Sequence, residues 1–181
     1  MAFINVEIKA RTEKAAAIRE YLIAKGAEFK GTDQQTDTYF NTRQGRLKLR
    51  EGNIENNLIY YERNNQAGPK QSHFSLLPVT DAAGLKAMLA ASMGIKVVVE
   101  KKREIYFIGN VKFHLDTVQP LGHFVEIEAS NKYADLSPEA LDEQCRFYLQ
   151  QFGIQDKDLV EVSYSDMLLA LPAIVAGENV S

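Results

Sequence analysis

The sequence predicts an α+β fold in which an antiparallel β-sheet, closed or nearly closed on itself, carries flanking helices. Two observations favour this fold. Many short segments alternate apolar with polar residues, as residues 111–116 (VKFHLD) do, and strict alternation is typical of strands with two different faces. Segments with helical periodicity lie between these strands, and their apolar sides need a surface to pack on. Helices that pack on the outside of the sheet satisfy that need.

Each element can be placed along the chain in order. The predicted strands share the alternation of apolar and polar residues and cover residues 3–10, 36–41, 47–51, 58–63, 73–79, 97–108 and, on either side of a turn at 119–122, the stretch 111–128. The predicted helices, with Thr12, Asp81 and Ser137 as N-caps of the first three, cover residues 12–25, 81–94, 137–153 and 159–171. Residues 64–72 are turn-rich and predict a loop. We expect a single domain over residues 1–171 and a flexible tail over residues 172–181.

The predicted turn at Gly109-Asn110 fixes the register of the two strands that it joins. With these two residues in the turn, Arg103 lies opposite Asp116 on the polar face, and Ile105 lies opposite His114. The row of polar side chains therefore continues across at least two strands.

Charged and polar residues gather on one face of the predicted sheet: Glu7, Lys9, Lys48, Arg50, Arg63, Lys101, Arg103, Lys112, His114, Asp116, Glu126 and Glu128. This face either surrounds an apolar barrel or points inward beneath an apolar exterior that helices cover, and the amphipathic helices favour the inward arrangement. A lumen lined by both signs of charge is costly to desolvate unless it is wet and holds an anion together with a cation. Arg and Lys suit phosphate oxygens, whereas carboxylates suit a hard cation such as Mg²⁺ or Mn²⁺.

Composition limits the classes of function. The formal net charge of −3 argues against a basic tail or a general nucleic-acid surface. The single Cys145 excludes an internal disulfide and a cysteine-rich zinc site, which fits a reducing cytoplasm. No apolar run approaches the ~20 residues that a membrane-spanning helix needs. We therefore expect a cytoplasmic protein with neither a nucleic-acid nor a membrane partner, and a homodimer stays open.

Several motifs carry a resemblance to a known family. They follow one another as Asn5-Val-Glu7-Ile-Lys9, Asp37-Thr-Tyr39-Phe40, Leu47-Lys-Leu-Arg50, Lys101-Lys-Arg103-x-x-Tyr106, His114-Leu-Asp116-x-Val118, Leu121-Gly-x-Phe-x-Glu126-x-Glu128 and Ser163-Tyr164. By these motifs the chain resembles the CYTH superfamily of triphosphate tunnel metalloenzymes over nearly its whole length, and most of all the class IV adenylate cyclase branch. The resemblance implies an eight-stranded antiparallel tunnel that holds a triphosphate and a divalent metal ion.

The resemblance also implies roles for individual residues. The expected ligands of Mg²⁺ or Mn²⁺ are Glu7, Glu126 and Glu128. The residues expected to bind the triphosphate are Lys9, Lys48, Arg50, Arg63, Lys101, Arg103 and His114. Among the polar residues, Lys9, Arg103 and Asp116 are predicted to act in catalysis. Two departures from the family pattern bear on activity: Asn5 stands where the signature has a first Glu, and residues 73–79 carry less charge than in many members.

Three classes of function stay open. The first is a metal-dependent enzyme on a triphosphate: a class IV adenylate cyclase-like enzyme that converts ATP to cyclic AMP and pyrophosphate, or a triphosphatase on inorganic or thiamine triphosphate. The second is a non-catalytic sensor that binds a polyphosphate or nucleotide, which Asn5 favours. The third, a lipid- or RNA-binding barrel, is disfavoured by the carboxylates and by the negative net charge. The cyclase-like enzyme is the function that the motifs favour.

Overall fold

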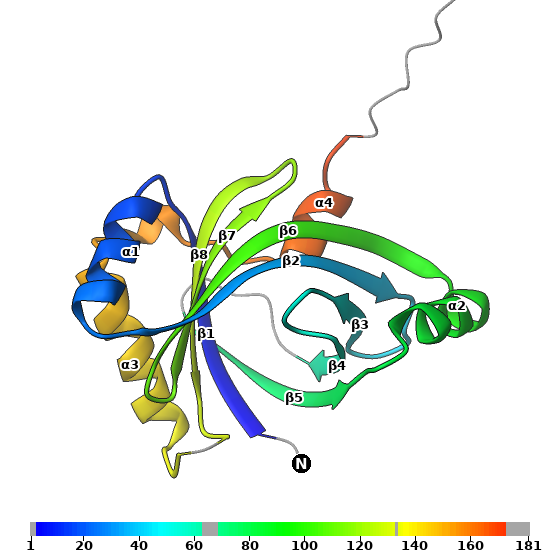
Figure 1. Cartoon of the computed structure of the whole chain (residues 1–181), viewed down its shortest axis with the longest axis horizontal. Helices are drawn as coiled ribbons and strands as arrows, with labels where there is room; N and C mark the ends of the chain where they lie inside the picture. The colour runs from blue at the N-terminus through cyan, green and yellow to red at the C-terminus, as the bar shows by residue number, and fades with distance from the viewer. Residues whose placement is uncertain (1–2, 63–68, 133, 173–181) are drawn as a thin grey trace, which may run out of the picture.

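The computed structural model describes residues 3–62, 69–132 and 134–172, and the side chains of residues 70–74 are left out of the description. Its strands are β1 (Phe3–Arg11), β2 (Glu28–Phe40), β3 (Arg46–Glu51), β4 (Asn57–Glu62), β5 (Lys70–Pro78), β6 (Ile95–Ile108), β7 (Val111–Val118) and β8 (Gly122–Ser130). They form one antiparallel sheet in the order β1-β5-β4-β3-β2-β6-β7-β8. The sheet closes into a barrel because β1 pairs with both β5 and β8. The predicted eight-stranded closed barrel is confirmed (Figure 1).

Helices flank the barrel unevenly. They are α1 (Ala15–Ala24), α2 (Ala82–Met93), α3 (Pro138–Gln151) and α4 (Tyr164–Leu169), with a 3₁₀ turn at Asp156–Asp158. Figure 1 shows α1 and α3 together on one side of the barrel, α2 at the opposite end and α4 beside β6. None of the helices in the described part of the chain is long and apolar enough to span a membrane.

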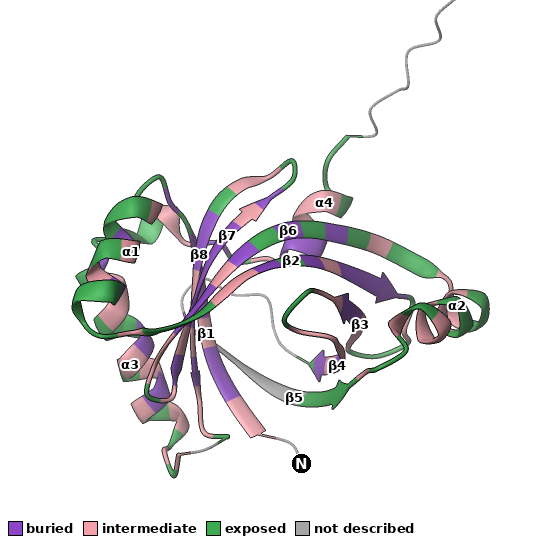
Figure 2. Cartoon of the chain, viewed as in Figure 1, coloured by how far each residue is buried: buried purple, intermediate pink, exposed green. Residues whose placement is uncertain are grey.

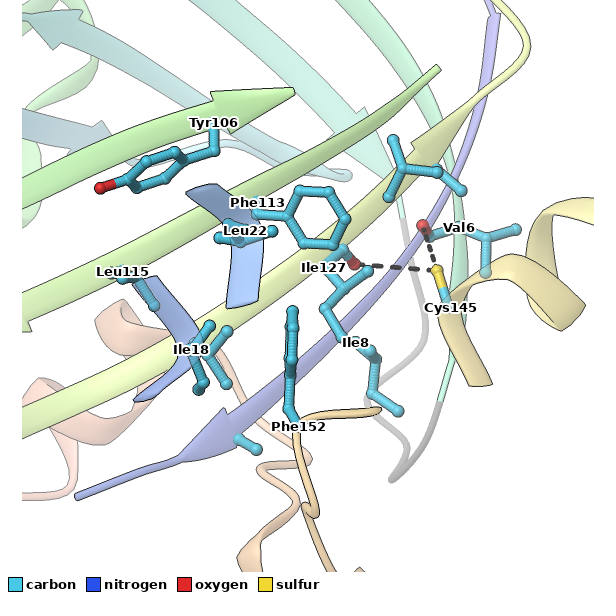
Figure 3. Close-up of a cluster of buried hydrophobic side chains, with 14 of the residues drawn as sticks. Val6, Ile8, Ile18, Leu22, Tyr106, Phe113, Leu115, Ile127, Cys145 and Phe152 are labelled. Carbon is cyan, nitrogen blue, oxygen red and sulfur yellow. Dashed lines mark hydrogen bonds between the residues drawn. The ribbon is translucent and has the colours of Figure 1, made fainter. Parts of the chain in front are cut away.

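The largest apolar core lies between the barrel and the helices α1 and α3. Ile8, Phe113 and Ile127 point outward from β1, β7 and β8, and they pack with Ile18 and Leu22 of α1 (Figure 3). Burial of such side chains contributes roughly 1.5–3 kcal/mol each. In the same cluster the Cys145 thiol of α3 donates to the carbonyl oxygen of Val6 at 3.3 Å. Figure 2 shows the resulting contrast between buried β1, β7 and β8 and the exposed end of β5.

The predicted hairpin register is confirmed. Arg103 pairs with Asp116, Ile105 with His114, and Ile108 with Val111 across the β6–β7 turn. Two predicted helix caps are also present, since the side chain of Asp81 accepts from the Gly84 amide and that of Ser137 from the Ala140 amide.

Several element boundaries differ from the prediction. Helix α1 begins at Ala15, not at Thr12, because Thr12 Oγ1 accepts a hydrogen bond from the Lys14 amide and forms a local turn instead. The second strand begins at Glu28, not at residue 36, since it pairs with β6 along its full length. The loop predicted over 64–72 ends sooner, because Lys70 already belongs to β5. Residues 63–68 lie outside the described part.

The last helix is shorter than predicted over 159–171. Residues 159–162 run along the barrel instead, where the Val160 amide donates to the Lys9 carbonyl oxygen at 2.9 Å. Helix α4 then starts after Ser163, whose side chain accepts from the Asp166 amide. Apart from residue 172, the predicted tail lies outside the described residues.

Candidate functional site

The barrel encloses a cavity of about 770 Å³ that its polar face lines. The polar side chains that line it, apart from three tyrosines, are Asn5, Glu7, Lys9, Asp37, Lys48, Arg50, Glu55, Asn57, Lys101, Arg103, Lys112, His114, Glu126, Glu128, Ser130, Lys132 and Ser163. Of the two arrangements open to the sequence, charges outward or charges inward, the structure has the inward one.

The structure brings together nearly all of the residues predicted for the site. Every predicted metal-binding and triphosphate-binding residue lines the cavity, with the exception of Arg63, which lies outside the described residues. Asp116, predicted to act in catalysis, is buried behind Arg103 and does not line the cavity. Strand alternation accounts for this convergence, because residues two apart on one strand point to the same side.

One group of residues, which we call the Asp116 cluster, comprises Lys9, Arg103, His114, Asp116 and Glu126. The Arg103 guanidinium donates to both oxygens of Asp116, at 2.7 and 2.5 Å, and to Glu126 Oε2 at 2.8 Å. The Tyr164 hydroxyl at the start of α4 donates to Asp116 Oδ2 at 2.7 Å. Burial opposes the charge on Arg103, yet Asp116 and Glu126 raise the pKa of its guanidinium well above the ordinary value. Arg103 therefore stays charged.

The other two members of the Asp116 cluster differ in charge. The Lys9 ammonium lies 3.5 Å from Glu126 Oε1 and 4.1 Å from the centre of the Tyr164 ring. The His114 Nδ1 atom lies 3.1 Å from Glu126 Oε2. Burial, and then Arg103, lower the pKa of His114 to about 3, although Glu126 opposes them. His114 is therefore neutral at pH 7 and adds no positive charge to the cavity.

A second group, which we call the Asp37 cluster, comprises Asp37, Lys48, Arg50 and Lys101. The Asp37 carboxylate accepts from Lys48 at 2.9 Å, from Lys101 at 2.8 Å and from two nitrogens of Arg50 at 2.9 Å each. Burial favours the neutral acid, but Arg50, Lys101 and Lys48 hold the pKa of Asp37 well below its ordinary value. Three cations therefore share this single carboxylate.

Lys101 is the cation of the Asp37 cluster whose pKa lies near neutral pH. Its side chain is only 2% exposed. Burial, together with the neighbouring cations Arg50, Arg103 and Lys48, lowers the pKa of Lys101 to about 7, although the nearby Asp37 opposes the shift. An anion placed in the cavity would favour the charged form of this lysine.

Glu7 and Glu128 are the residues best placed to bind a metal ion. They are directly opposite each other on β1 and β8, and both line the cavity. Burial raises the pKa of Glu128 despite the Lys112 ammonium, and the carboxylates of Glu126 and Glu55 add to the rise. A divalent cation would relieve this crowding of negative charge, so the pair fits the oxygen ligands that Mg²⁺ and Mn²⁺ take.

Glu126 differs from this pair because Arg103, His114 and Lys9 already contact its carboxylate. Within the described ranges no three His, Cys, Asp or Glu side chains are gathered closely enough to hold a metal. This geometry suits an ion held by one or two carboxylates and completed by waters and phosphate oxygens.

Sequence reasoning missed three residues of the site. Asp37 belongs to the Asp37-Thr-Tyr39-Phe40 motif without an assigned role, and its pairing opposite Arg50 on β3 is the signal that reveals its place in the site. Tyr164 belongs to the Ser163-Tyr164 motif without an assigned role, and in the structure its hydroxyl donates to Asp116. Glu55 lies in the β3–β4 loop, where no periodicity could indicate its direction.

The arrangement as a whole can hold a polyanion. Lys48, Arg50, Lys101 and Arg103 supply cations from several walls of one enclosed cavity, where charge-assisted hydrogen bonds are stronger than in water. The facing residues Glu7 and Glu128 add carboxylates of the chemical type that a hard cation binds. Phosphate chemistry with a divalent metal uses both features.

Comparisons with known proteins agree with the fold. At a TM-score of 0.76, the PH1012 protein from Pyrococcus horikoshii OT3 is similar over 90% of this chain and 98% of its own, with 24% sequence identity. A candidate adenylate cyclase from Vibrio parahaemolyticus is similar at a TM-score of 0.74 over 92% of this chain and 98% of its own, with 22% identity. HpAC1 from Hippeastrum, a candidate adenylyl cyclase with a dominant triphosphatase activity, has a TM-score of 0.60 and 14% identity over 92% and 94% of the two chains.

At these identities the structural similarities establish the fold alone. A search of curated proteins gave no significant match. The CYTH domain, in contrast, matches the sequence over residues 4–164, which include all eight strands of the barrel. The chain therefore belongs to the CYTH domain family.

Proposed function

We propose that the protein is a divalent-metal-dependent enzyme that acts on a triphosphate bound inside the barrel. One observation carries the proposal. On one side of the cavity, buried Lys and Arg side chains outnumber the carboxylates, and on another side Glu7 and Glu128 face each other. A lumen of this polarity is costly unless a ligand completes it, and a triphosphate with a hard cation supplies both signs of charge.

The residues divide into three roles under this proposal. Lys9, Lys48, Arg50, Lys101 and Arg103 bind and orient the phosphates, with Arg103 and Lys9 stabilising the charge that develops in the transition state. Glu7 and Glu128, with Glu126 beside them, are the proposed metal ligands. The chemistry that Mg²⁺ or Mn²⁺ supplies there, when bound, is neutralisation of negative charge on phosphate oxygens.

Two predicted roles change because of their surroundings. Asp116 accepts two hydrogen bonds from Arg103 and does not line the cavity. We therefore propose that Asp116 positions the guanidinium and does not touch the substrate. His114 binds the phosphates only as a neutral hydrogen-bonding group. Its Nδ1 lies beside Glu126, so Glu126 orients the ring.

The finer proposal is an adenylate cyclase-like reaction. In it the ribose 3′-hydroxyl of ATP attacks the α-phosphorus, the bond to the bridging oxygen breaks, pyrophosphate leaves, and the proton of the hydroxyl passes to water. The motifs from Lys101 to Tyr164, which most resemble the class IV cyclases, support this choice. In this proposal Lys9 and Arg103, which both line the cavity, stabilise the charge on the departing pyrophosphate.

Hydrolysis of a triphosphate is the second candidate, because the same cations serve attack by water at the terminal phosphorus. The triphosphatase activity of the structurally similar HpAC1 favours this candidate. The two reactions differ in products, so one assay separates them.

The test is incubation of the purified protein with ATP, tripolyphosphate or thiamine triphosphate and either Mg²⁺ or Mn²⁺. Cyclic AMP with equimolar pyrophosphate indicates the cyclase, and phosphate release indicates the triphosphatase. Glu128→Gln should abolish either activity while the circular dichroism spectrum stays unchanged. Full activity of this variant at matched metal concentration would contradict the assignment of the metal site, and binding of a triphosphate without turnover would favour the sensor.

A further inference from the structure

Glu55 belongs to the β3–β4 loop but extends across the cavity. Its Oε2 accepts from Arg50 Nη1 at 2.8 Å, and its Oε1 accepts from Lys112 Nζ at 2.5 Å. Arg50 lies on β3 and Lys112 on β7, and these strands are separated in the sheet by β2 and β6. The carboxylate therefore bridges two walls of the barrel that are not neighbours.

The buried Asp33 side chain fixes the loop that carries Glu55. The carboxylate of Asp33, which is fully buried, accepts from the backbone amides of Asn53 at 2.7 Å, Ile54 at 3.0 Å and Glu55 at 3.0 Å. A Cβ atom at Gly52 would lie 2.6 Å from both Asp33 oxygens, so this close approach requires glycine. The position of Glu55 is thus fixed by the fold and not by the Glu55 side chain alone.

Glu55 fills a position that suits an anion. A guanidinium nitrogen and an ammonium group converge on its two oxygens, as they would on the oxygens of a phosphate group. Both oxygens already accept hydrogen bonds, Oε2 also from Gln35 Nε2 at 3.2 Å. The three donors, from Arg50, Gln35 and Lys112, already occupy most of the roughly four acceptor positions of the carboxylate, which disfavours a role as the acceptor for a cationic or amino group of the substrate.

We propose that Glu55 is a specificity-determining residue that sets where a bound polyphosphate ends. Its carboxylate occupies the anion position between Arg50 and Lys112, so the cavity favours a triphosphate and rejects a longer chain of phosphates. This inference rests on the proposed function, since it names the length of anion that the same cavity takes.

Binding of tripolyphosphate and tetrapolyphosphate, measured by calorimetry in EDTA so that no turnover occurs, tests this role. Glu55→Gln keeps the shape of the side chain and removes its charge. Glu55→Gln should raise the affinity for tetrapolyphosphate about tenfold or more, which is the scale of one charge-assisted hydrogen bond. The affinity for tripolyphosphate should change less than about threefold. Glu51→Gln is the matched control, because Glu51 lies on the same β3 strand, pairs with Lys86 and does not line the cavity. It should leave both affinities unchanged.

Lys112→Met provides a second measurement that does not depend on one variant folding well. In the wild-type protein the Glu55 carboxylate neutralises Lys112. In Glu55→Gln or Glu55→Ala the Lys112 ammonium loses this partner, so it becomes available to the fourth phosphate of tetrapolyphosphate. The loss of tetrapolyphosphate affinity on Lys112→Met should therefore be at least about fivefold greater in the Glu55 variants than in the wild-type protein.

The outcomes separate this inference from the proposed function. If the wild-type protein binds tripolyphosphate and the Glu55 variants keep the same preference between the two chains, Glu55 does not set the length and the proposed function stands. If neither the wild-type protein nor the variants bind either polyphosphate in EDTA, this inference is overturned, and the turnover assay with Mg²⁺ or Mn²⁺ decides the proposed function separately. If only the Glu55 variants bind, the anion position is supported and the proposed substrate of the wild-type protein is wrong.

Discussion

The Asp116 and Asp37 clusters face the same cavity but differ in their balance of charge. In the Asp116 cluster two cations, Lys9 and Arg103, meet two carboxylates, because His114 is neutral. In the Asp37 cluster Lys48, Arg50 and the partly protonated Lys101 meet the single carboxylate of Asp37, and Glu55 contacts only Arg50 among them. The first cluster is close to neutral by itself, and the second retains positive charge. Removal of one charge should therefore harm the fold in the first cluster and the binding of anions in the second.

The largest effect is expected from Asp116→Asn. This change leaves the buried Arg103 guanidinium without its bidentate partner and alters the acceptor of the Tyr164 hydroxyl. Breaking a buried ion pair by removal of one partner costs about 3–5 kcal/mol, and we expect a loss of that size in the free energy of unfolding, measured with urea.

Asp142→Asn is the control for Asp116→Asn. Asp142 pairs with Arg146 one helical turn away on the outside of α3, and the Arg146 side chain is 62% exposed. Loss of such a surface pair should cost less than about 0.5 kcal/mol. A similar cost for the two variants would mean that Glu126 alone suffices to balance Arg103.

Lys48→Met should have the opposite profile. Asp37 keeps Arg50 and Lys101 as partners, so the free energy of unfolding should change by less than about 1 kcal/mol. Binding of tripolyphosphate should weaken by about 1.5–3 kcal/mol, the range for a hydrogen bond to a charged group. Calorimetry with urea unfolding on the same samples checks both halves of the prediction. Unchanged affinity that is also independent of salt would show that Lys48 does not contact the anion.

The difference between the clusters was only partly predictable. The alternation of residues and the Gly109-Asn110 turn were enough to predict the closed barrel, its inward charges and the pairing of Arg103 with Asp116. These features depend on local patterns, which a sequence displays directly.

The Asp37 cluster, in contrast, depends on a long-range pairing. Strand β2 has little alternation from Glu28 to Gln35, contains Gly31, and becomes a strand because β6 pairs with it, with an irregularity between Phe29 and Gly31. Without that pairing, nothing in the sequence places Asp37 between Lys101 and Arg50. Loop residues such as Glu55 escape prediction for the same reason, since a buried carboxylate, here Asp33, sets their direction.

The pH dependence of anion binding should reveal the excess charge of the Asp37 cluster. Lys101 faces Asp37, Lys48, Arg50 and Arg103, and the Tyr164 ring lies 6.0 Å from its ammonium group. Its pKa of about 7 means that it loses its proton as the pH rises from 6 to 8 in the free protein. An anion binds the charged form better, so affinity should fall with rising pH, by at most about tenfold per pH unit for one proton.

Tripolyphosphate titrations at pH 6, 7 and 8, with the wild-type protein and Lys101→Met, measure this effect. The ionisation of the ligand is common to both proteins, so the difference between the two profiles belongs to Lys101. Parallel profiles would show that Lys101 keeps its proton throughout this range.

The smallest effect is expected from Asn5→Glu, which adds a carboxylate to the wall that carries Glu7. Asn5 is buried and lines the cavity, and its Oδ1 atom has no hydrogen-bond partner among the described residues. An amide oxygen can coordinate a hard cation but brings no charge. The variant should therefore bind Mg²⁺ or Mn²⁺ about threefold to tenfold more tightly without substrate, which corresponds to about 0.7–1.4 kcal/mol.

Calorimetry with each metal alone, repeated in the presence of a non-hydrolysable triphosphate, measures this effect independently of turnover. The gain should shrink when the triphosphate is present, because phosphate oxygens then supply ligands that the wild-type protein lacks. Asn57→Asp is the matched control, since Asn57 also lines the cavity but lies on β4, away from β1 and β8 in the sheet. Equal metal affinity in the wild-type protein and Asn5→Glu would place the metal away from residue 5, and the sensor would lose the residue that favours it.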